Sequence, residues 1–248
     1  SVLFDLFKAS GFWARFWPAL LGTCAVLLPF LYRKWLGGST ALVLTALIAL
    51  DPMMIGASRS AGGTMLALVG VFAALGFWLN NRPVLSGVFL GVALTGGSAF
   101  WQLALITAGV FAIWRKKPAN RDDTSLNSTR GIHPLVIVLT IAAISSLLFS
   151  TLFFSLPNGI SAIGSSVVEY FSGWGEYDSR LLAGNSLAWL VIELPLIILG
   201  VWGFIDGMLK KDRFASIMGG WWALAVVLTL INPGGSSSNI VWVALPIL

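Results

Sequence analysis

Long apolar stretches separated by short polar connections are the feature that most constrains how this chain of 248 residues can fold. Most of them approach the roughly 20 apolar residues that a helix needs to cross the hydrocarbon of a bilayer. No alternation of apolar and polar residues typical of a membrane barrel is present, so we expect helices. The pattern predicts an all-α, polytopic membrane bundle of about eight or nine spans, forming one transmembrane domain over 1–248. The predicted spans are 16–32, 40–57, 63–80, 83–97, 99–114, 134–156, 187–208 and 214–231, with a partial span from 239.

Lys and Arg concentrate on every second connection between these stretches. Most of the 15 basic residues lie on four connections, at 33–39, 81–83, 115–133 and 209–213. A cytoplasmic excess of Lys and Arg sets the orientation of a polytopic protein. We therefore expect these four connections on the inner side of a prokaryotic plasma membrane. The net charge of +5 then reflects topology and not affinity for nucleic acid, since no basic stripe interleaved with aromatics is present.

Composition supports the membrane interpretation and limits the chemistry. The mean hydropathy is +0.89, and only 10% of the residues are charged. The single Cys24 excludes an intrachain disulfide and a multi-cysteine metal site. Residues Phe4–Lys8 do not form a cleavable signal pattern. Because the last residues, Val243–Leu248, read as the start of another span, we expect the chain to be a piece of a longer protein, incomplete at both ends.

Three segments are predicted not to span the membrane. Residues 1–15 alternate apolar and polar groups and are expected along the outer interface, whereas 115–133 form a charged inner loop. Residues 157–186 form a long outer loop. Within it, apolar residues recur at helical spacing and predict a short amphipathic helix on the membrane surface, broken by Gly173–Gly175. These apolar residues are Ile160, Ile163, Val167, Val168 and Phe171.

Asp51 and Arg59 bracket a turn at the outer ends of the second and third predicted spans, and Asp51 is a candidate cavity or substrate-binding residue. Arg59 stands against the positive-inside trend, and its planar fork suits a lipid phosphate. Two other interpretations stay open: Arg59 reaches outward to lipid headgroups, or it pairs with Asp51.

Glu193 lies inside the seventh predicted span, where a carboxylate is costly and usually faces a bundle interior or a wet cavity. The alternative is a neutral Glu193 bonded to a neighbouring helix. In the outer loop, Glu176, Asp178 and Arg180 cluster with Trp174 and Tyr177, a combination that suits sugar binding. A solvated loop with a local ion pair explains the same cluster.

Short motifs along most of the chain resemble the bacterial GT-C membrane glycosyltransferases of the protein-mannosyltransferase-like group. In that family a Ser-Arg-x-Ala-Arg-x-Asp sequence follows a Pro turn, and here Ser58–Ala61 begins such a sequence. The second half resembles a related prokaryotic group that handles lipid-linked sugars. The motifs that carry the resemblance are Arg15–Gly22, Leu31–Gly38, Ala46–Pro52 and Ser58–Ala61, then Glu193–Leu196, Lys211–Phe214 and Trp221–Trp222.

The resemblance implies a GT-C fold that transfers a sugar from a polyprenyl-phosphate donor to an outer-face acceptor. It implies Arg59 as the donor-phosphate contact. The chain departs from the family pattern where Gly62 replaces the second Arg and Thr64 the acidic residue, and where Gly96–Gly97 replace a polar turn. The family's usual catalytic Asp falls upstream of Ser1.

Alternatives to this enzyme stay open. The rival is a non-catalytic membrane subunit or scaffold with a degenerate GT-C fold, and the third possibility is a transporter, although no inverted repeat is visible. The catalytic residues are left open. So is the cofactor, since a divalent metal would suit the chemistry but no ligand set is identifiable. The expected partners are membrane lipids, a polyprenyl-phosphate sugar and other membrane subunits.

Overall fold

The computed structural model describes residues 11–60, 63–115, 134–151, 159–172, 174, 179–210, 212–231 and 241–247. Every regular element within these ranges is helical, so the predicted all-α fold class is confirmed. The elements are α2 (Gly11–Leu27), η1 (Leu28–Tyr32), α3 (Arg33–Leu36), α4 (Gly38–Leu50), α5 (Pro52–Arg59), α6 (Thr64–Leu79), α7 (Pro83–Leu94), α8 (Ser98–Arg115), α9 (Pro134–Ser150), α10 (Gly159–Ser172), α11 (Ser179–Leu209), α12 (Arg213–Ile231), α13 (Val241–Ala244) and η3 (Leu245–Ile247).

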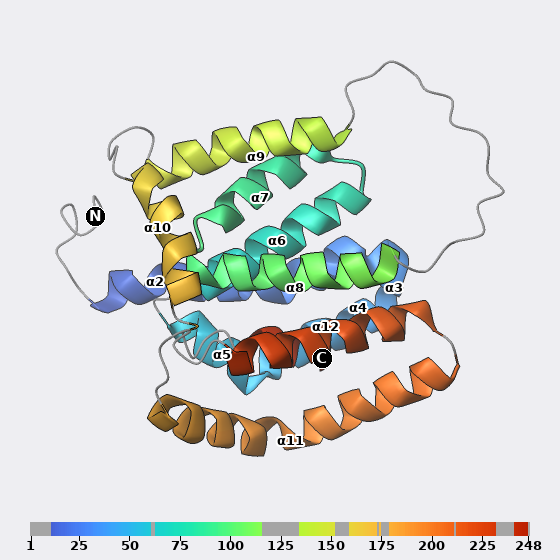
Figure 1. Cartoon of the computed structure of the whole chain (residues 1–248). Helices are drawn as coiled ribbons and strands as arrows, with labels where there is room; N and C mark the ends of the chain where they lie inside the picture. Colours follow the sequence, from blue (N-terminus) through green and yellow to red (C-terminus); the bar gives the residue numbers. More distant parts are fainter. Residues whose placement is uncertain are drawn as a thin grey trace.

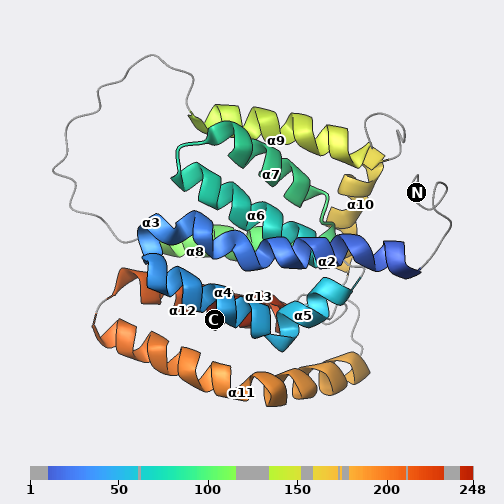
Figure 2. The ribbon, with the colours of Figure 1, turned by 180° about the vertical axis from the view of Figure 1, so that it is seen from behind.

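The long helices lie side by side, and successive ones run in opposite directions (Figures 1 and 2). This alternation gathers α3, the α6–α7 turn and the α11–α12 connection at one end of the bundle (Figure 1). We call it the basic end, because Arg33, Lys34, Arg82 and Lys210 lie there. The opposite end holds the last residues of α5, the α7–α8 turn and α10, which crosses the ends of its neighbours (Figure 1).

The first apolar stretch is interrupted where α2 passes into η1. Pro29 lies at the start of η1 and has no N–H to donate to the preceding turn. Two side-chain hydrogen bonds fix the segment that follows. The Tyr32 hydroxyl donates to the Phe72 carbonyl, and Asn80 Nδ2 donates to the Leu31 carbonyl at 2.9 Å. The start of α3 is thereby tied to the end of α6.

The second apolar stretch is broken at Asp51. The sequence indicates that Pro52 interrupts this stretch; in the structure a new helix, α5, begins at Pro52 and is bent by 58° from α4. Proline is well suited to the first helical position, where its missing N–H has no intrahelical partner to lose. The break therefore redirects the chain without ending the helical structure.

α7 packs between α6 and α9 through glycines that admit no side chain. A Cβ added at Gly91 would lie 1.9 Å from Ser145 Oγ, and one added at Gly70 would lie 2.7 Å from Ala93 Cβ. Gly87 similarly meets Ile141 at 2.7 Å. Gly87 and Gly91 form a glycine pair four residues apart on α7. Small residues at this spacing let helices approach closely, as they do in membrane bundles.

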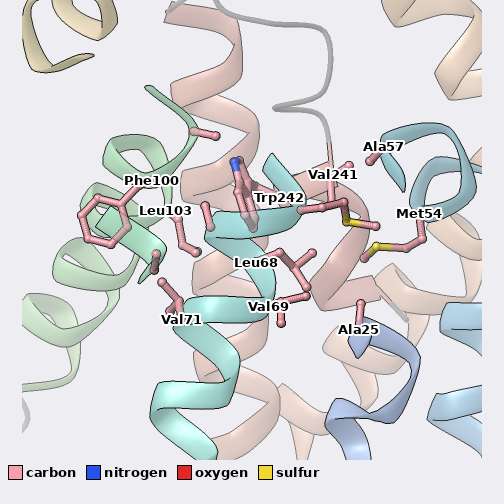
Figure 3. Packing of buried hydrophobic residues seen from close by; sticks show 14 of the residues in the cluster. Ala25, Met54, Ala57, Leu68, Val69, Val71, Phe100, Leu103, Val241 and Trp242 are labelled. Carbon is pink, nitrogen blue, oxygen red and sulfur yellow. The ribbon is translucent and has the colours of Figure 1, made fainter. Parts of the chain in front are cut away.

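The largest group of buried apolar side chains joins α5, α6, α8, α12 and α13, as Figure 3 shows in part. Trp242 of α13 is fully buried within it, next to side chains of α6 and α8 (Figure 3). The predicted partial span from 239 is thus represented by the single helical turn of α13 and the short η3, and its first residues are buried in the core.

α10 occupies the segment where the sequence predicts an amphipathic helix, and the described apolar residues of that prediction lie along one side of it, partly buried and partly exposed. Ile163 and Val167 are half-buried against the bundle, whereas Val168 and Phe171 are exposed. α10 is tied to α8 by a hydrogen bond from Trp101 Nε1 to Ser166 Oγ at 3.0 Å.

Two predicted boundaries differ from the structure. α11 begins at Ser179 and runs for 31 residues, so the predicted start at 187 and the predicted loop end at 186 are wrong. Polar residues in 179–186 suggested a loop, but nothing in that segment prevents the helix from extending to Ser179. α2 begins at Gly11, inside the segment 1–15 predicted to lie at the interface. Residues 1–10 and 116–133 lie outside the described ranges.

Length and hydropathy identify one described stretch, Phe16–Leu36, that is long and apolar enough to cross a membrane by itself. The bent pair α4–α5 meets the same criteria only when its two helices are taken together. The remaining apolar segments, from Thr64–Leu79 onward, have 10–17 residues. Three of these segments belong to longer helices, since α8, α11 and α12 have 18, 31 and 19 residues. A helix as short as α7 crosses a bilayer only if flanking residues or local thinning make up the difference.

Candidate functional site

The candidate site is the end of α5, where Arg59 is exposed. α5 is held by close packing: a Cβ added at Gly22 of α2 would lie 2.6 Å from Ser58 Cβ. Met54 and Ala57, on the same short helix, are buried in the core against α13 (Figure 3). Arg59 is therefore the exposed last residue of a helix whose inner face is fixed.

Asp51 fixes the other end of α5. Its carboxylate accepts hydrogen bonds from the backbone N–H groups of Met53 at 3.1 Å and Met54 at 3.3 Å, and Asp51 is only 2% exposed. An N-cap carboxylate satisfies orphan donors and lies at the positive end of the helix dipole. Asp51 is thus occupied as a helix cap.

The structure does not pair Asp51 with Arg59. The two residues flank the two ends of α5, which at 8 residues is roughly 12 Å long. Within the described residues, Arg59 takes part in no ion pair, and the ion pair found there joins Lys210 to Asp206 at 2.6 Å. Of the interpretations of Arg59, pairing with Asp51 is thereby wrong, while a phosphate contact and a headgroup contact both stay open.

Ser60 and Gly63, the described residues nearest to Arg59 on its C-terminal side, are tightly constrained. The Ser60 hydroxyl donates to the Ala57 carbonyl at 2.8 Å. A Cβ added at Gly63 would lie 2.1 Å from the Gly96 carbonyl oxygen, so the α5–α6 and α7–α8 turns touch backbone to backbone. Thr64, which follows, is 1% exposed. The position at which the family pattern carries an acidic residue is therefore buried in this chain.

An exposed guanidinium on a fixed helix suits recognition of phosphate. Arg presents a rigid fork of donors that can engage two phosphate oxygens at once. Figure 2 shows α5 beside α2, at the end of the bundle away from α3 and its basic residues. Among the exposed described Arg and Lys residues, Arg59 lies at the opposite end, whereas Arg33, Lys34, Arg82 and Lys210 lie at the basic end.

The other candidates are only partly covered by the structure. Glu176 and Asp178 lie outside the described residues. Arg180 lies in the first turn of α11, and Glu193 lies in the same helix two residues before Pro195, but their side chains are outside the description. The cavity-facing prediction for Glu193 and the sugar-binding prediction for the loop cluster therefore stay predictions. No group of three metal-ligating side chains occurs within the described residues.

A buried polar contact between α8 and α12 was missed by the sequence analysis. Gln102, 1% exposed, donates from Nε2 to Thr229 Oγ1 at 3.1 Å. Its Oε1 atom is buried without a hydrogen-bond partner in the described structure, and so is the indole N–H of Trp242. A glutamine inside an otherwise apolar stretch was the available signal. Polar side chains of this kind join helices inside membranes.

Comparison of the chain with protein-family models, with curated proteins and with solved structures finds no match.

Proposed function

We propose that the chain is a polytopic membrane bundle whose basic end faces the cytoplasm. Large apolar side chains are exposed along its helices, among them Leu50, Trp202 and Leu209. Contact with lipid removes the cost of exposing such residues to water. Glycine-mediated helix contacts and the single described ion pair support the same environment. The segregation of basic residues at one end supports the proposed orientation in a prokaryotic plasma membrane.

We further propose that this bundle is a GT-C-type glycosyltransferase that uses a polyprenyl-phosphate sugar at its outer face. One observation carries the proposal: Arg59 is exposed, in no described ion pair, and fixed at the end away from the basic connections. Positive charge retained in the cytoplasm does not account for it. Its role is to hold the donor phosphate and to stabilise the negative charge that develops as the sugar leaves.

Transfer to an acceptor hydroxyl also needs a general base. Asp51 does not fill this role, because its carboxylate is bound to the backbone N–H groups at the start of α5. We therefore assign the base to no described carboxylate. A divalent metal at the donor phosphate would add to the effect of Arg59.

A second candidate function is a non-catalytic membrane subunit that binds the lipid phosphate without transferring the sugar. The burial of Thr64 favours it, since the family's acidic position faces the core here. The occupied Asp51 carboxylate favours it as well. In this alternative Arg59 still contacts the lipid phosphate, but the bond between the sugar and the phosphate is not broken.

The experiment measures binding of a short-chain polyprenyl phosphate to the purified full chain in neutral detergent micelles. A charge-assisted hydrogen bond contributes about 1.5–3 kcal/mol, so Arg59→Ala should weaken binding about tenfold or more. Arg59→Lys should recover only part of the affinity, because Lys lacks the fork. Lys210→Ala removes an exposed cation at the basic end whose charge is already paired with Asp206, and it serves as the control.

Equal binding by Arg59→Ala and the unmodified chain would contradict the donor-phosphate contact and would indicate that Arg59 contacts lipid headgroups. Equal weakening in Arg59→Ala and Lys210→Ala would indicate a general charge effect and would contradict a phosphate site at Arg59. Release of radiolabelled sugar from the polyprenyl-phosphate sugar then separates the two candidate functions, because a non-catalytic subunit binds the lipid and releases none.

A further inference from the structure

Exposed basic residues from two separate turns meet at the basic end of the bundle. Arg33 and Lys34 open α3, and Arg82 precedes α7; all three side chains are exposed. Nearly fifty residues of chain separate the two turns, so their proximity is a product of the fold. The arrangement places three cations on one edge of the bundle.

Side-chain hydrogen bonds hold the two turns together. Asn80 Nδ2, two residues before Arg82, donates to the Leu31 carbonyl at 2.9 Å and to the Gly76 carbonyl at 2.8 Å. The packing is close there as well, since a Cβ added at Gly76 would lie 3.0 Å from Leu31 Cβ. The neighbouring Tyr32 hydroxyl donates to the Phe72 carbonyl. The backbone that carries the three cations is therefore fixed.

The three cations are not neutralised within the described part of the chain. Arg33, Lys34 and Arg82 form no ion pair there. Lys210 at the same end behaves differently, because Asp206 one helical turn away pairs with it at 2.6 Å. Positive charge needed only for orientation does not have to be gathered on two hydrogen-bonded turns. The grouping of these three cations therefore favours the binding of an anionic ligand.

Trp35 indicates where that ligand lies. It follows Lys34 directly, and it is 68% exposed although it is one of the largest apolar side chains in the protein. An exposed Trp beside basic residues is typical of the membrane–water interface, where the ring sits at the level of the headgroups. From these observations we propose that Arg33, Lys34 and Arg82 form a binding site for the phosphate of an anionic phospholipid in the inner leaflet.

The inference rests on the membrane placement proposed above, but it is independent of sugar transfer and of Arg59. It assigns the site to a lipid and not to free phosphate, because Trp35 adds an apolar contact that a soluble anion would not use. Clustered Lys and Arg next to a membrane attract anionic lipids with about 1 kcal/mol per residue. Each cation should therefore contribute about a fivefold gain in affinity.

The test titrates the purified full chain, in neutral detergent, with dioleoyl phosphatidylglycerol and follows bound lipid by native mass spectrometry. Arg33→Gln, Lys34→Gln and Arg82→Gln should each weaken binding about fivefold, and the triple variant on the order of a hundredfold. Lys210→Gln is the matched control and should change binding less than twofold, because its charge is already paired with Asp206. Dioleoyl phosphatidylcholine should bind equally to all variants.

A further variant separates a built site from simple positive charge. Asn80→Ala keeps every cation but removes the Asn80–Leu31 hydrogen bond between the two turns, and it should weaken phosphatidylglycerol binding about two- to fivefold. Circular dichroism checks that each variant is folded. If the triple variant is not folded, the single substitutions test the proposal.

Unchanged binding in the folded variants would overturn the proposal, as would equal losses for Lys210→Gln and Arg82→Gln. Displacement of the lipid by soluble glycerol phosphate at similar concentration would show a free-phosphate site instead. Polyprenyl phosphate binding measured on the same variants keeps the two proposals distinct. If polyprenyl phosphate binding does not depend on Arg59 but phosphatidylglycerol binding depends on Arg33, Lys34 and Arg82, only the function proposed for Arg59 is contradicted. If the opposite result is found, only the lipid site is contradicted.

Discussion

The two ends of the bundle are closed by different kinds of contact. At the basic end, side chains join the turns, with Asn80 and Tyr32 donating to backbone carbonyls. At the opposite end, Gly63 and Gly96 bring two turns together backbone to backbone, with no space for a side chain. The basic end thus leaves its cations facing outward on a fixed surface, whereas the opposite end is compact and presents Arg59 at its edge.

In the proposed membrane placement, the charge at the basic end sets the orientation of the bundle, and Arg59 at the opposite end recognises a ligand. Positive charge at the basic end fits retention in the cytoplasm together with lipid contact. Arg59, which among the residues with described side chains is the exposed Arg at the opposite end, needs another reason, and a phosphate ligand supplies one. The two ends differ in this way only if they lie on different sides of a membrane, if the glycine contact is rigid, and if the hydrogen bond between α8 and α10 holds α10 in place.

The largest expected effect concerns the sides of the membrane. In a Cys24→Ser background, a cysteine at Lys210 should resist an impermeant thiol reagent in intact cells, and one at Ser172 should react. Both positions are exposed, and they lie at the basic end and on α10 respectively. The contrast should be close to all-or-none, because the reagent does not cross the bilayer.

Membranes opened by detergent provide the control, since both cysteines should then react. Labelling of the Lys210 position but not of the Ser172 position in intact cells would reverse the proposed orientation. Equal labelling of both positions in intact cells would show that the two ends do not lie on different sides of a membrane.

The next largest effect is expected at Gly63. The added Cβ of Gly63→Ala would lie 2.1 Å from the Gly96 oxygen and 2.6 Å from the Gly96 carbonyl carbon, and backbone atoms cannot rotate away as a side chain can. We expect destabilisation of about 3 kcal/mol, seen as a fall of about 6–12 °C in the melting temperature in micelles.

Gly56→Ala is the matched control for this substitution. Gly56 lies inside α5, is exposed, and has no neighbouring atom within 4 Å of an added Cβ. Because alanine favours helix by about 1 kcal/mol over glycine, the control should melt slightly higher than the unmodified chain. A Gly63→Ala variant as stable as the Gly56→Ala variant would show that the two turns separate easily.

Hydropathy was enough to predict most of the helices. The predicted span 99–114 corresponds to α8 (Ser98–Arg115), and 63–80 to α6 (Thr64–Leu79). These agree because apolar composition and turn residues act locally on the chain. The start of α11 was missed because helix formation at 179–186 does not require apolar residues there.

The candidate site was predictable only in part. Charge asymmetry and the family resemblance singled out Arg59, and the structure leaves its side chain exposed. Asp51 followed by Pro52 was a local signal for a helix start and for a capping role of Asp51, whereas the 58° angle between α4 and α5 could not be predicted from it. The pairing of Gln102 with Thr229 depended equally on how α8 meets α12, since the two residues are 127 positions apart.

The smallest effect is expected where α10 meets α8. Ser166 Oγ accepts from Trp101 Nε1 at 3.0 Å and donates to the Ile163 carbonyl at 2.7 Å, and Ser166 is buried. Trp101→Phe removes the donor, and Ser166→Ala removes the acceptor. A hydrogen bond of this kind contributes about 0.5–1.5 kcal/mol, which corresponds to a fall of about 1–6 °C in melting temperature.

The double variant makes this prediction specific to the contact. If the hydrogen bond is what couples α10 to α8, Trp101→Phe and Ser166→Ala together should cost less than the sum of the single substitutions, by about 1 kcal/mol. Additive losses would mean that packing of the indole ring, and not the hydrogen bond, holds α10 across the opposite end. In that case α10 would be held there mainly by its buried face around Tyr170, which is 1% exposed, and the opposite end would need no polar tie of the kind that joins the turns at the basic end.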